Sequence, residues 1–109
     1  MTVLGARFNG DAVAIGYIRL DVPGEPEDAH RAAIRDLAEN WNYVVPRILQ
    51  VDEFTAAPIQ LLLNTIRTYR ADAVFVPSAR HFDKSAVPDE VLAACDVVTV
   101  ADKQTYERR

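Results

Sequence analysis

The sequence predicts an α/β fold: a three-layer, open and mainly parallel sheet of about four strands with flanking helices. Two observations support this prediction. Short, almost continuous apolar runs, which suit strands covered on both faces, alternate with segments whose apolar residues recur at helical spacing. The connections are short, and the resulting order β-α-β-α-β-(α)-β is typical of parallel sheets joined by helical crossovers.

The first strand is expected at residues 12–20, which are nearly all apolar. A loop with two prolines and a glycine follows at residues 21–26. Acidic residues then open a helical stretch, where the helix macrodipole favours negative charge. The apolar face of this helix has the spacing i, i+3, i+4 and i+7, at Ile34, Leu37, Ala38 and Trp41.

The second strand is expected at residues 43–51. Pro46 lies inside it and has no N–H for a ladder hydrogen bond, so this strand should lie at a sheet edge or carry a bulge. Pro58 suits the first position of a second helix, where its missing N–H is not needed. The apolar face of that helix consists of Ile59, Leu62, Leu63 and Ile66.

Two more apolar runs predict strands at residues 73–76 and 97–100. Between them, residues 78–88 are polar and irregular, and residues 89–94 are expected to form a short helix. Residues 1–11 are interpreted as an N-terminal arm and residues 102–109 as a polar, frayed C-terminal tail. We therefore expect a single domain over residues 12–101.

Composition limits the classes of function. The chain has 109 residues, which fits one domain, and its net charge of −4 argues against a non-specific nucleic-acid binder. The one cysteine, Cys95, excludes an internal disulfide and is expected to be a small buried apolar residue. No apolar run approaches the roughly 18–20 residues of a membrane span, and the start shows no signal-peptide pattern. A cytoplasmic protein without a membrane partner is the expectation.

Cofactor and metal motifs are missing from the sequence. Neither a Gly-x-Gly-x-x-Gly loop nor a Walker-type loop follows the first strand. His30 and His81 have no metal-ligand spacing, and His30 is interpreted as a helix-surface residue. We therefore expect no cofactor and no metal.

Four short segments carry a family resemblance. Residues 16–21, Gly-Tyr-Ile-Arg-Leu-Asp, resemble the strand that opens the catalytic domain of the serine recombinases (resolvases and invertases). There the strand reads Tyr-x-Arg-Val-Ser, and the serine attacks DNA. Residues 30–44 resemble the family's first helix, residues 71–78 its third strand and residues 96–100 the next strand. The resemblance covers about residues 12–101 and implies a resolvase-like sheet of strand order 2-1-3-4, with Pro46 on an edge strand.

The nucleophile position departs from the family pattern. The family's serine falls on Asp21, and its arginine before the second helix falls on Ala56 or Ala57. A carboxylate at this position repels the phosphate. If it attacked, it would form an acyl phosphate that water hydrolyses, so the DNA would not be rejoined.

The later motif departs as well. The family's Ser-x-Asp-Arg-Leu-x-Arg reads Ser-Ala-Arg-His-Phe-Asp-Lys at residues 78–84. Its Asp-Arg pair falls on Arg80 and His81, and its final arginine on Lys84, while Arg19 and Ser78 are kept. Each transition-state contact of this kind is worth about 3–4 kcal/mol, and lysine replaces bidentate arginine poorly. The resemblance therefore implies a domain without recombinase activity.

The family's long dimer helix and its DNA-binding domain have no counterpart in this sequence. DNA binding by this chain alone is therefore expected to be weak or absent.

A candidate pocket collects the remaining polar residues. In open parallel sheets, ligands gather beyond the carboxyl ends of the strands. The residues at or just after such ends are Arg19, Asp21, Ser78, Arg80, His81 and Lys84. We favour the interpretation that Asp21 pairs with a neighbouring cation and neutralises the cluster, over an anion site built by the cations.

Three hypotheses of function remain. The favoured one is a catalytically inactive, resolvase-like module that binds a protein partner or itself, in a regulatory or mobile-element setting of DNA recombination. The alternative is a module that binds a phosphorylated ligand or a nucleic-acid phosphate through Arg19, Arg80 and Lys84. The third is an enzyme of another kind with Asp21 as nucleophile or base, although no supporting acidic pair is evident.

Overall fold

The structure, a computed structural model, describes residues 12–109. Over these residues the sheet has five strands, in the order β2-β1-β3-β4-β5. Its strands are β1 (Ala12–Arg19), β2 (Tyr43–Val51), β3 (Ala73–Val76), β4 (Asp96–Thr99) and β5 (Gln104–Tyr106). The helices are α1 (Glu27–Asn40), α2 (Pro58–Tyr69) and the short α3 (Asp89–Leu92), with two 3₁₀ turns, η1 (Ala79–His81) and η2 (Asp83–Ser85). The first four strands are parallel, so the predicted α/β class and 2-1-3-4 order are confirmed.

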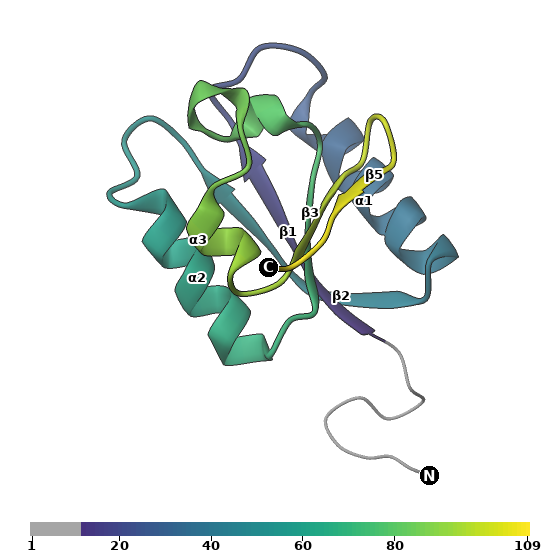
Figure 1. Cartoon of the computed structure of the whole chain (residues 1–109). Helices are drawn as coiled ribbons and strands as arrows, with labels where there is room; N and C mark the ends of the chain where they lie inside the picture. Colours follow the sequence, from purple (N-terminus) through teal and green to yellow (C-terminus); the bar gives the residue numbers. More distant parts are fainter. Residues whose placement is uncertain (1–11) are drawn as a thin grey trace, which may run out of the picture.

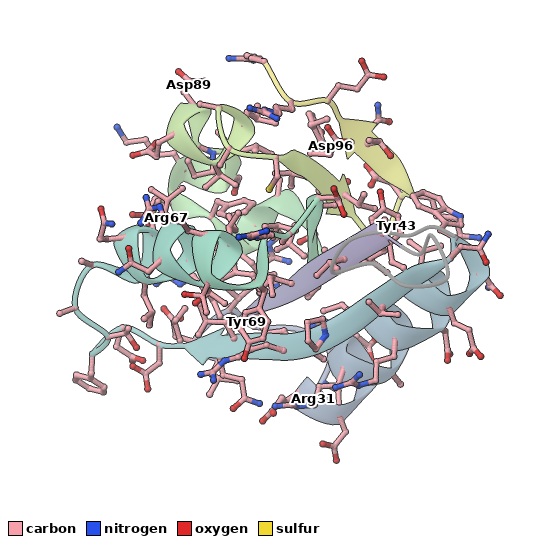
Figure 2. The ribbon with its side chains drawn as sticks, turned by 90° about the horizontal axis from the view of Figure 1, so that it is seen from below. Arg31, Tyr43, Arg67, Tyr69, Asp89 and Asp96 are labelled. Carbon is pink, nitrogen blue, oxygen red and sulfur yellow. The ribbon has the colours of Figure 1, made fainter. Side chains whose placement is uncertain are left out.

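Helices cover both faces of the sheet, as Figure 1 shows with α1 on one side and α2 and α3 on the other. Alternate residues of β1 supply the two cores, because successive side chains of a strand point to opposite faces. Ala14 and Ile18 pack with the predicted apolar face of α1. Ile15 and Tyr17 pack with α2 and α3. Figure 2, turned from the first view, shows the sheet between α1, which carries Arg31, and α2, which carries Arg67.

Pro46 has both of its predicted consequences. Within residues 12–109, β2 pairs with β1 alone and forms one edge of the sheet. Val13 pairs with Val44, but Ile15 pairs with Arg47, so β2 advances one residue further than β1 between these pairs. This irregularity is a bulge at Pro46, where a residue without an N–H interrupts no ladder hydrogen bond.

The C-terminal segment differs from the expected frayed tail. Residues 104–106 form β5, which pairs antiparallel with β4. Beyond it, the Arg108 N–H donates to Asp96 Oδ1 at 2.7 Å and the Arg109 N–H to the Leu92 carbonyl at 2.9 Å. The strand is held by backbone hydrogen bonds and its side chains are exposed, so it leaves no apolar pattern in the sequence. Residues 1–11, interpreted as an arm, lie outside the described residues.

Two expectations about single residues can be compared with the core. Cys95 is buried, as predicted, and burial raises the pKa of its thiol to about 12. Trp41 lies edge-on to Phe75 with ring centroids 6.2 Å apart, yet it stays partly exposed at the end of α1. Within residues 12–109, no helix is long and apolar enough to cross a membrane.

Gly16 in β1 leaves no room for a side chain, because Ile48 of β2 lies close beside it. A Cβ there would lie 2.8 Å from Ile48 Cγ1 and 3.1 Å from Ile48 Cγ2. Ile48 is buried and β-branched, so it cannot turn away freely. We expect Gly16→Ala to lower the free energy of unfolding by about 2 kcal/mol through overpacking, as measured by urea unfolding.

The matched background is Ile48→Ala, which removes both of these Cγ atoms. In that background the new methyl group of Gly16→Ala should be neutral or stabilising. If Gly16→Ala destabilises both backgrounds equally, the contact with Ile48 is not the cause.

Candidate functional site

The candidate residues lie where the loops after β1 and β3 meet, at the carboxyl ends of the parallel strands (upper part of Figure 1). Arg19 ends β1, and Asp21 follows in the loop to α1. Residues 78–84 follow β3 and contain η1 and the start of η2. Proximity at this edge was predicted, but the structure sorts the six residues into an Arg19–Asp21 ion pair, a group of three beside a cavity, and Lys84 outside both.

Arg19 and Asp21 form a fork-shaped ion pair at the end of β1. Arg19 Nε donates to Asp21 Oδ1 at 3.1 Å, and Nη2 donates to Oδ2 at 2.8 Å. Arg19 Nη1 donates to Asp83 Oδ1 at 2.8 Å. The hydrogen bonds to Asp21 raise the pKa of Arg19 and lower the pKa of the Asp21 carboxyl. The predicted pairing of Asp21 with a nearby cation is therefore present.

Asp83 is the site residue that sequence reasoning missed. It occupies the variable position of the Ser-x-Asp-Arg-Leu-x-Arg motif, where the family resemblance assigns no role. Its place follows from Phe82, which stacks on Tyr17 with ring centroids 5.4 Å apart and an interplanar angle of 13°. This buried stack fixes the start of η2 beside β1 and so brings Asp83 to Arg19. Burial raises the pKa of Tyr17 to about 12, so its hydroxyl is neutral.

His81 is buried between the two loops. Its Nδ1 accepts a hydrogen bond from the Arg19 backbone N–H at 2.9 Å, so the neutral ring carries its proton on Nε2. Burial lowers the pKa of His81 to about 4, which keeps the ring neutral at pH 7. His30 of α1 lies edge-on to it with ring centroids 5.1 Å apart. His30 was expected on the helix surface; it is instead half-buried against this partner.

A cavity of about 640 Å³ opens on the α1 side of the same loops. Three of the candidate residues line it, namely Ser78, Arg80 and His81. Ser78 Oγ accepts the Arg80 backbone N–H at 3.3 Å and so caps η1. The other walls come from the loop after β1, from α1 and from the end of β4.

Lys84 joins neither group. It is exposed in η2 with a left-handed backbone (φ 60°), and it does not line the cavity. The three cations of the candidate site therefore do not converge: Arg19 faces two carboxylates, Arg80 borders the cavity, and Lys84 faces solvent. Among residues 12–109, no three His, Cys, Asp or Glu side chains are grouped as metal ligands.

Comparisons with known proteins agree with this architecture. No family model matches the sequence, and no curated protein matches it significantly. The structure is similar to the solved crystal structure of the N-terminal catalytic domain of TP901-1 integrase, with a TM-score of 0.63 and 17% sequence identity. The match covers 85% of this chain and 80% of that one. At this identity the likeness establishes the fold, and the resolvase-like fold predicted from the short motifs is confirmed.

Proposed function

We propose that this chain is a recombinase-related domain that performs no strand transfer and acts as a protein-interaction or regulatory module. The fork between Arg19 and Asp21 is the observation that carries the proposal. Strand transfer needs a hydroxyl that attacks the phosphodiester and arginines that face the phosphate. By the family resemblance, the nucleophile position falls on Asp21. Its carboxylate binds the Arg19 guanidinium, which would otherwise contact the phosphate.

The rest of the charge-stabilising set is also replaced. The remaining guanidinium nitrogen of Arg19, Nη1, donates a hydrogen bond to Asp83. The position of the family's motif arginine holds His81, which is buried and neutral. Because each lost transition-state contact removes about 3–4 kcal/mol, several losses together with the missing hydroxyl leave no basis for recombination chemistry.

Support for an interaction role comes from the loop between β2 and α2. Phe54 is 87% exposed, although its loop is ordered by side-chain hydrogen bonds. Asp52 Oδ1 accepts the Phe54 N–H at 2.9 Å, and Thr55 Oγ1 accepts the Asp52 N–H at 3.0 Å. An aromatic side chain held in solvent by an ordered loop is the kind of anchor on which protein interfaces centre.

The alternative, a phosphorylated ligand held by Arg19, Arg80 and Lys84, is less well supported. Such a ligand would have to displace Asp21 or Asp83 from Arg19. It would also have to draw together cations that the structure holds apart.

The proposal is tested first by incubating the protein with supercoiled plasmid and looking for covalent protein–DNA adducts. We expect no adduct and no nicking by the wild-type chain or by Asp21→Ser, because the hydroxyl alone restores one part of a missing set. An adduct formed by the wild-type chain and abolished by Asp21→Asn would overturn the proposal.

Removing the Asp21 carboxylate should release Arg19 toward solvent anions. We expect Asp21→Ser to raise the affinity for a short DNA duplex by about three- to tenfold at low salt, as measured by fluorescence anisotropy. Asp36→Ser removes the same charge from an exposed position of α1 and should change the affinity less than twofold. Equal gains for both variants would show a net-charge effect and no release of Arg19.

The interaction role is tested by sedimentation velocity over a wide range of protein concentration. If the module binds itself, Phe54→Ser should weaken the association, whereas substitution of the exposed Glu53 by Gln should not. A chain that stays monomeric throughout would contradict self-association.

A further inference from the structure

The cavity on the α1 side has the position and size of a ligand site. It lies at the carboxyl ends of β1, β3 and β4, between α1 and the loop after β3. From β1 the chain continues to β2 on one side, and β3 lies on the other, so this is the point at which the strand order reverses. Open α/β sheets bind ligands at such points, and a volume of about 640 Å³ is ordinary for a small-molecule pocket.

The polar groups of the cavity are mainly hydrogen-bond donors. His81 Nδ1 is used by Arg19, so its Nε2 carries a hydrogen. Within residues 12–109, no side chain accepts a hydrogen bond from Nε2. No fully buried side-chain nitrogen in this range lacks a hydrogen-bond partner, so Nε2 is not fully buried and reaches accessible space. The space that His81 lines is the cavity. The Ser78 hydroxyl and the exposed Arg80 guanidinium border it as further donors.

The remaining walls are mostly apolar. They are formed by short side chains and prolines, which leave room for a planar body: Val22, Pro23, Ala29, Ala33, Pro77, Val100 and Ala101. Arg80 and Glu25 are the charged residues of the lining, and they have opposite signs. Because these two charges offset one another, the lining has no net positive charge to balance the two negative charges of a phosphate monoester, whereas its hydrogen-bond donors can serve a singly charged group.

We propose that this cavity binds a small organic carboxylate with a flat apolar body. Its carboxylate accepts hydrogen bonds from Ser78, His81 and Arg80, and its body lies against the alanine and proline walls. None of these contacts uses the Arg19 guanidinium or the Asp21 carboxylate, although His81 also accepts the Arg19 backbone N–H, so the proposal does not depend on the absence of strand transfer.

The chain offers a direct reporter, because His30 and His81 are its two histidines and both line the cavity. Benzoate is the probe, titrated into ¹⁵N-histidine-labelled protein at neutral pH and followed by imidazole NMR. We expect saturable shifts of both rings, with His81 in the Nε2–H form. Benzamide, which has the same body without the charge, and acetate, which has the charge without the body, should each bind at least tenfold more weakly.

Paired variants locate the probe. Ala33→Leu fills the cavity and should abolish the benzoate shifts, whereas Ala32→Leu on the same helix should not. Arg80→Met should weaken benzoate about tenfold or more, and Arg47→Met, at an exposed position of β2, should leave it unchanged.

The absence of any imidazole shift with benzoate would overturn the proposal. So would saturable shifts that survive Ala33→Leu, because they would place the probe outside the cavity. Phenyl phosphate binding more tightly than benzoate would overturn the assignment of a carboxylate.

Discussion

Replacing Tyr17 with alanine is expected to lower the free energy of unfolding by about 4 kcal/mol. Tyr17 is 1% exposed and belongs to the core between the sheet and α2. Its ring also stacks on Phe82, which starts the loop that carries Asp83. The substitution therefore leaves a cavity under the site as well as a loss of buried apolar area. Urea unfolding followed by the fluorescence of the single tryptophan, Trp41, measures the effect.

Tyr17→Phe is the matched control, because it keeps the ring and removes the hydroxyl alone. We expect it to change the free energy of unfolding by no more than about 1 kcal/mol. Amide NMR of residues 78–85 should show large shifts in Tyr17→Ala and small ones in Tyr17→Phe. Unchanged amide shifts in Tyr17→Ala would contradict the idea that this stack positions Asp83.

The elements that sequence analysis predicted correctly are those whose pattern is set by the core. β1, β3 and β4 are covered on both faces, so their sequences are continuous apolar runs. α1 and α2 each bury one face, so their apolar residues recur with the helical period. Pro46 was informative for the same kind of reason, because a missing N–H restricts where a strand can lie.

β5 could not be predicted in this way. Its three residues are exposed, and backbone hydrogen bonds to β4 hold it. Backbone pairing depends on where the chain returns in space rather than on side-chain pattern. A short polar segment that meets a sheet edge therefore resembles a tail in sequence.

Sequence analysis identified most residues of the candidate site but only part of their spatial arrangement. Parallel strands place their carboxyl ends together, which correctly brought Arg19, Asp21 and the loop after β3 to one edge. This rule does not say on which face a side chain lies. Arg19 is held by Asp21 and Asp83 and does not line the cavity, whereas Ser78 and Arg80 border the cavity on the α1 side. The contact of His30 with His81 joins α1 to η1 and has no local signal in the sequence.

The stability of the fold should fall by about 3 kcal/mol as the pH is lowered from 6.5 to about 4, because of His81. Burial lowers the pKa of His81 from its ordinary 6.5 to about 4. Between these values the unfolded chain binds a proton and the folded chain does not, so acid favours unfolding. The His81 contribution is fully present above pH 6.5 and is lost progressively below it. The lowered pKa of Asp21 acts in a more acidic range, below its ordinary 3.8.

His81→Asn separates this effect from general acid unfolding, since an amide oxygen can accept the Arg19 N–H but does not titrate. Urea unfolding at a series of pH values should show that most of the slope between pH 6.5 and 4 disappears in His81→Asn, while His30→Asn retains most of it, because burial is the main cause of the lowered His81 pKa. Imidazole NMR of the wild-type chain should show His81 neutral at pH 6.5 and beginning to take up its proton only as the pH approaches about 4. A slope that persists in His81→Asn would assign the acid sensitivity to other groups. A slope lost in His81→Asn would assign the acid sensitivity to protonation of the buried His81 ring, which must lose its burial and its hydrogen bond from the Arg19 N–H when it becomes charged.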